Sequence, residues 1–96
     1  EAELTLAQTR TQQEALRAQS ELDLAQRQLD MARERQALTA DNLNLAQRSF
    51  ELGESDLPTL MRARAASHEA QAWFKRQETA HSLAQSRLLQ AQGVLP

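Results

Sequence analysis

FELGESDLP, the sequence of residues 50–58, breaks a long helical pattern and so divides the chain into two predicted helices. Gly53 can adopt the left-handed conformation that ends a helix. Ser55 or Asp56 can then cap the next helix, and Pro58 suits its first turn, where the missing N–H loses no hydrogen bond. A connection of about four residues is short enough to make the two helices antiparallel.

The residues on both sides of this corner favour helix. Ala, Leu, Gln, Glu and Arg, all good helix formers, make up most of the chain, and only two Gly and two Pro interrupt them. Residues typical of strands are scarce, since Val94 is the single valine and isoleucine is absent. The sequence therefore predicts an all-α protein. We expect one long antiparallel two-helix coiled-coil hairpin that occupies residues 1–96, with helices over about 2–52 and 57–92.

The first predicted helix carries two apolar rows. Alternating steps of four and three, typical of a helix packed on a partner, connect Ala18, Leu22, Ala25, Leu29, Ala32, Gln36, Thr39, Leu43, Ala46 and Phe50. A second row, the leucine stripe, repeats every seven residues and consists of Leu24, Met31, Leu38, Leu45 and Leu52. It lies about 100° around the helix from the nearer row of the first series. Two interpretations stay open: neighbours on both sides of the helix, or one broad apolar face.

The second predicted helix has a narrow, alanine-rich row and a row at intervals of seven. The narrow row is Ala63, Ala66, Ala70, Trp73, Gln77, Ala80, Ala84 and Ala91. The other row contains Leu60, Phe74, His81 and Leu88, with polar Ser67 between the first two. Alanine buries little area, so two such helices gain only modest hydrophobic stabilisation from each other. We therefore expect the isolated hairpin to self-associate as an antiparallel homodimer, forming a four-helix bundle.

Catalytic, cofactor and metal sites are not expected. The chain has no cysteine, and His68 and His81 are too far apart in sequence to share one helix face as ligands. No nucleophile is paired with a base, and no glycine-rich phosphate loop occurs. The net charge is −2 with acids and bases interspersed, which excludes the basic stripe of a nucleic-acid binder. The sequence predicts a scaffold or interaction element and not an enzyme.

Charged residues gather around the corner. The acidic groups can stabilise the start of the second helix through its dipole, or they can form an acidic surface that faces a partner. Arg62 and Arg64 follow directly, and we expect them to pair with Glu51 or Glu54, with docking of an acidic partner as the alternative.

Residues 46–65, AQRSFELGESDLPTLMRARA, resemble the outer membrane efflux protein family, the TolC-like channels. Members of this family show an aromatic residue, a Leu-Gly or Val-Gly pair, and then a leucine-rich start of the next helix. Their long helices end in a Leu-Gly phrase, for which this chain has AQGVLP at 91–96 with Gln92 in the place of leucine. The resemblance implies a fragment of the periplasmic tunnel of a homotrimeric channel in a Gram-negative outer membrane, serving as a passive export duct.

The resemblance also implies a docking tip. In the family, the turn that matches Leu52 and Gly53 contacts a periplasmic adaptor (membrane fusion) protein and, through it, an inner-membrane pump. The implied adaptor-docking tip comprises Phe50, Leu52, Gly53, Glu54, Ser55 and Asp56. The implied gating residues are Glu54, Asp56 and Arg62. No cofactor is implied.

Two other functions remain open from the sequence. The chain can be the α-hairpin of an adaptor protein, for which Arg48 and Leu52 fit the tip pattern while Thr59 stands where a serine is usual. It can also be an unrelated coiled-coil dimerisation module. The exported substrate, whether a metal ion or a drug, leaves no signal in these residues.

Overall fold

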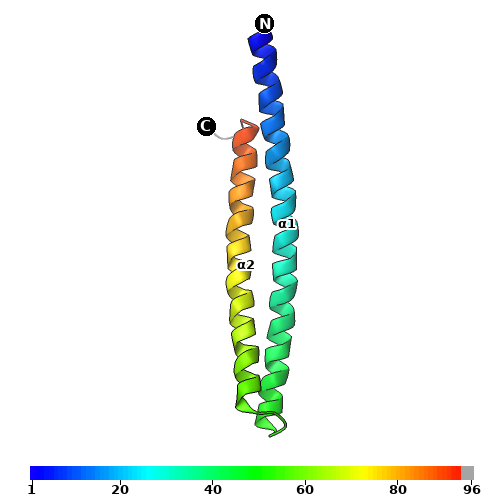
Figure 1. The fold of residues 1–96 in the computed structure, drawn as a ribbon, viewed down its shortest axis with the longest axis vertical. Coiled ribbons are helices and arrows are strands. Elements are labelled where there is room, and N and C mark those ends of the chain that lie inside the picture. Colours follow the sequence, from blue (N-terminus) through cyan, green and yellow to red (C-terminus); the bar gives the residue numbers. More distant parts are fainter. Residues whose placement is uncertain (94–96) are drawn as a thin grey trace.

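The computed structural model describes residues 1–93 and consists of two antiparallel helices joined by a short corner (Figure 1). Helix α1 spans Ala2–Glu51 and helix α2 spans Leu57–Ala91. The hairpin is a rod, with dimensions of 77 × 20 × 15 Å. This confirms the predicted fold class, and both helices lie within about a residue of the predicted bounds. Residues 94–96, which belong to the AQGVLP phrase, lie outside the described residues.

Gly53 ends α1 as its sequence context predicts. Its φ angle is +73°, a value that L-residues with a side chain rarely adopt. The Gly53 N–H donates to the Phe50 carbonyl at 3.0 Å, and the Glu54 N–H donates to the Ser49 carbonyl at 2.8 Å. These two bonds form a Schellman motif, which satisfies carbonyl groups left free at the end of α1. The chain can therefore reverse direction within five residues.

The four-three series on α1 forms its contact with α2. Ala18, Ala25, Leu29 and Ala32 are buried, and the other members as far as Ala46 are half-buried. Phe50, the last member of the series, lies at the edge of the contact with α2 and is 37% exposed. The predicted seam on α1 is thus confirmed, with burial fading toward the corner.

On α2 the predicted division into two rows is wrong. The seam consists of residues from both rows in alternating steps of three and four: Leu60, Ala63, Ser67, Ala70, Phe74, Gln77, His81, Ala84, Leu88 and Ala91. All of these are buried or half-buried, whereas Ala80 of the predicted narrow row is exposed. The reason is geometric: residues three and four apart share one helix face, so the two rows are adjacent strips of the same face.

The interior between the helices is thin. Ala32 and Ala70 are completely buried, but no large side chain in residues 1–93 is fully enclosed. In addition, α1 continues past the end of α2, and residues 1–14 are all exposed (Figure 1). The stability of a single hairpin therefore depends on many small contacts, each of which contributes little.

Candidate functional site

The corner exposes several large apolar side chains. Leu52, Leu57 and Met61 are exposed to 67%, 52% and 46%, and Phe50 lies at the rim. Gly53, next to Leu52 in the chain, lies on open surface, since a Cβ built there would meet no atom within 4 Å. The depression around Gly53 is lined by the polar residues Glu54, Ser55, Asp56 and Thr59. Apolar groups gathered at the end of a rod suit contact with another molecule. The sequence identified Phe50 and Leu52 but missed Leu57 and Met61, whose spacing of four residues was the available signal.

Asp56 is the N-cap of α2. Its carboxylate accepts a hydrogen bond from the Thr59 backbone N–H at 3.1 Å and another from the Thr59 hydroxyl at 2.6 Å. These bonds, together with the positive charge of Arg62, hold the pKa of the Asp56 carboxyl below its ordinary value of 3.8. Asp56, and not Ser55, therefore caps the helix. Ser55 is half-buried, and its hydroxyl oxygen is enclosed without a hydrogen-bond partner.

The expected ion pairs at the corner are absent. In residues 1–93 the structure contains one ion pair, between Arg33 and Asp30 at 3.5 Å. Arg62 instead donates a hydrogen bond to the Thr59 hydroxyl at 3.3 Å, which joins it to the cap of α2. The expectation that Arg62 and Arg64 pair with Glu51 or Glu54 is therefore wrong for this hairpin. Of the implied gating residues, Asp56 and Arg62 both contact Thr59, while Glu54 is exposed at the corner.

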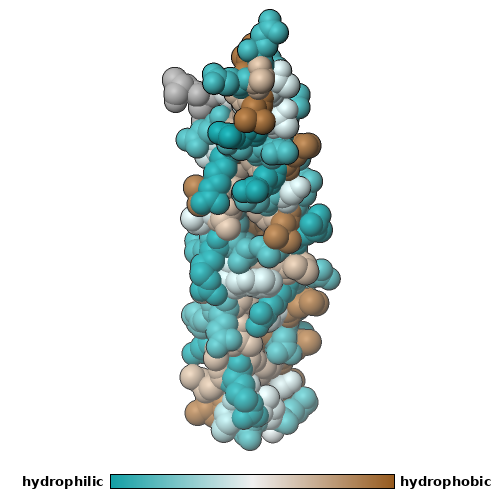
Figure 2. Space-filling model, turned by 45° about the horizontal axis from the view of Figure 1, so that its top comes forward, coloured by the Kyte–Doolittle hydropathy of each residue, from teal (hydrophilic) through white to brown (hydrophobic). Residues whose placement is uncertain are grey.

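The leucine stripe of α1 is a second candidate surface. Its five members are 48–67% exposed, and none contributes to the seam with α2. Figure 2 shows apolar side chains along the α1 edge of the rod, separated by polar ones. The structure thus decides one question that the sequence left open: the stripe is separate from the seam and is not part of one broad apolar face. An exposed, regular apolar row of this kind suits packing against another helix.

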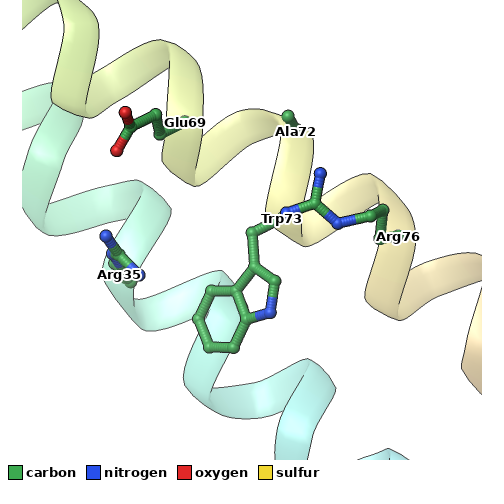
Figure 3. A pocket seen from close by; sticks show the side chains of 5 residues that line it. All are labelled: Arg35, Glu69, Ala72, Trp73 and Arg76. Atoms are coloured by element: carbon green, nitrogen blue, oxygen red, sulfur yellow. The ribbon is translucent and has the colours of Figure 1, made fainter.

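Two arginines of α1 lie over aromatic rings of α2. The Arg35 guanidinium is 5.5 Å from the centre of the Trp73 ring, and that of Arg33 is 5.8 Å from the centre of the Phe74 ring. Both distances are typical of cation–π contacts. Figure 3 shows the Trp73 indole reaching from α2 across to α1, with Arg35 on one side and Arg76 on the other. Because each contact joins a residue of α1 to a residue of α2, the two contacts help to hold the helices together.

The arrangement at the corner and the stripe suits binding. Among residues 1–93, no group of three or more His, Cys, Asp or Glu side chains is placed to hold a metal ion. Neither α1 nor α2 combines the length and apolar character that crossing a membrane requires. The Asp56 carboxyl, whose pKa is lowered, is solvent-exposed and already hydrogen-bonded to Thr59.

Comparison of the chain with known protein families, with curated proteins and with solved structures finds no significant match. The features that point to a function are the corner, the stripe and the resemblance of residues 46–65.

Proposed function

We propose that this hairpin is a wall segment of an outer membrane efflux channel and that its corner docks a periplasmic adaptor protein. The supporting observation is the exposure of apolar side chains at the corner, namely Phe50, Leu52, Leu57 and Met61, together with the open surface at Gly53. It coincides with the part of the sequence that resembles the TolC-like channels. In this proposal the parent protein is a homotrimer, the segment lies in the periplasm, and the adaptor connects the corner to an inner-membrane pump.

The corner suits docking for two physical reasons. The cap formed by Asp56 and the Schellman motif at Gly53 fix its backbone, so a partner meets a preorganised surface and little conformational entropy is lost on binding. The absence of a side chain at Gly53 also lets a partner helix approach the backbone closely. Leu52, directly beside it, offers a large side chain that a partner can bury.

The experiment measures binding between this hairpin and the α-hairpins of periplasmic adaptor proteins from several Gram-negative efflux systems. Dense immobilisation of the hairpin compensates for weak single-copy contacts through avidity. We expect Leu52→Glu to weaken binding by roughly 10- to 100-fold, the loss that follows from failing to bury one leucine. Gly53→Trp, which adds bulk at the corner, should block binding with helicity retained.

Leu16→Glu is the matched control, because Leu16 is 69% exposed, like Leu52, but lies far from the corner. It should bind as the unmodified chain does. If the Leu16 and Leu52 variants lose binding equally, the contact is not at the corner. If no adaptor hairpin binds, the proposal fails and a plain coiled-coil scaffold becomes the better interpretation.

A further inference from the structure

The outward face of α2 carries a row of small residues with the same spacing as the leucine stripe. This row, the alanine row, consists of Ala65, Ala72, Thr79 and Ser86, all exposed. It lies about 170° around α2 from the centre of the seam, so it points away from α1. Each hairpin thus has a row of large apolar side chains on one helix and a row of small, uncharged side chains on the outside of the other.

We propose that a second copy of this chain packs beside the first, with the leucine stripe of one copy against the alanine row of the other. Within the hairpin, Arg35 lies opposite Trp73 and Arg33 opposite Phe74. We place the second copy beside the first without a shift along the rod axis, so that residues of the two copies lie opposite each other as they do within one hairpin. In this register Leu38 of one copy lies between Ala65 and Ala72 of the other. Both rows repeat every seven residues, so Met31 and Leu24 meet the next two gaps along the alanine row, while Leu45 and Leu52 lie beyond its end.

The charges beside the two rows are complementary in this arrangement. On one side of the stripe, Glu34 faces Lys75 of the second copy. On the other side, Arg35 faces Glu69 of the second copy. All four side chains belong to exposed residues, and no two like charges occupy facing positions along the rows. The contact therefore gains electrostatic specificity as well as buried apolar area.

Antiparallel pairing of two leucine stripes along their full length, by contrast, is disfavoured. Such a pair is centred on Leu38, and it sets Arg27 against Arg48 and Glu34 against Asp41 of the second copy. The two-fold symmetry repeats each clash, so like charges meet at four places. Pairing of the leucine stripe with the alanine row avoids all four contacts between like charges. It also leaves a free stripe on one copy and a free alanine row on the other, so the contact can continue to further copies.

This inference deepens the proposed function, on which it depends for its biological setting, because it specifies how neighbouring wall segments contact each other. Its test is separate, since it measures association of this chain with itself and requires no adaptor. Failure of adaptor binding with self-association retained would contradict the proposed function alone. Failure of self-association with adaptor binding retained would contradict this inference alone.

Sedimentation equilibrium of charge-reversal variants tests the arrangement. Glu34→Lys should weaken self-association by roughly three- to tenfold, because two cations then face each other across the contact. Lys75→Glu should weaken it similarly, and the double variant should restore it. Glu34 and Lys75 lie on outward faces of different helices, so this rescue requires two copies. Native mass spectrometry should also detect complexes larger than dimers.

Asp23→Lys is the matched control. Asp23 is exposed on α1 away from the stripe, and its reversal should leave association unchanged. If Glu34→Lys strengthens association, two stripes pair with each other and the proposal is wrong. It is equally wrong if Lys75→Glu has no effect, if the double variant is not rescued, or if the chain remains monomeric at millimolar concentration. Circular dichroism verifies that each variant stays helical.

Discussion

The two helices use their seven-residue rows in opposite ways. The stripe on α1 is entirely apolar and entirely exposed. The corresponding row on α2, which starts at Leu60, includes Ser67 and His81, yet it is buried or half-buried throughout. Hydropathy alone would have buried the α1 stripe first. Within one hairpin, the position of a row relative to the partner helix, and not its apolar content, therefore determines whether the row is buried.

The difference arises from what lies beside each row. On α2 the row adjoins a strip of alanines three residues away, and the two strips together make a face that α1 can approach closely. On α1 the stripe is flanked by charged residues such as Arg27, Glu34 and Arg35. The small alanines of the four-three series let α1 and α2 approach closely, which the larger side chains of the stripe do not. The alanine-containing series therefore faces inward.

The largest expected difference between the two rows is in the free energy of unfolding when one leucine of each row is truncated to alanine. Leu60 is 4% exposed, and Leu60→Ala should lower the free energy of unfolding by about 2–3 kcal/mol, through lost burial and a residual cavity. Leu45 is 63% exposed, and Leu45→Ala should change it by less than about 0.5 kcal/mol. Urea denaturation at concentrations where the chain is monomeric measures both. Equal effects would mean that the stripe is buried in the folded monomer.

The sequence was sufficient for the fold and for part of the corner. Gly53 and Asp56 act through local backbone geometry, so the helix bounds were predictable and the cap could be narrowed to Ser55 or Asp56. The exposure of Ala80 was not predictable, because the rotation of α2 about its own axis depends on how both helices pack. Leu57 and Met61 were missed for a related reason: their exposure depends on how the chain turns after Ser55. The docking role of the corner stays a prediction.

An effect of intermediate size is expected when a polar residue in the α2 row is made apolar and an apolar residue in the α1 stripe is made polar. His81 is half-buried in the seam, and His81→Leu should raise the free energy of unfolding by about 1 kcal/mol through added apolar burial. Leu38→Gln, in the stripe, should leave monomer stability nearly unchanged while it weakens self-association. Thermal unfolding of dilute samples and sedimentation of concentrated ones separate the two effects. Destabilisation by His81→Leu would show that the polar group has a specific role in the seam.

The smallest effect concerns the contacts that hold the stripe outward. Arg35 over Trp73 and Arg33 over Phe74 connect the helices along the sides of the seam and resist rotation of α1. A double-mutant cycle of Arg35→Gln and Trp73→Leu should give a coupling energy of about 0.5 kcal/mol, as expected for an exposed cation–π pair. Arg17→Gln, which changes an exposed arginine far from the indole, provides the control cycle and should be additive with Trp73→Leu. If both cycles are additive, Trp73 contributes only its buried area. The rotation of α1, and with it the exposure of the stripe, is then set by the alanine seam alone.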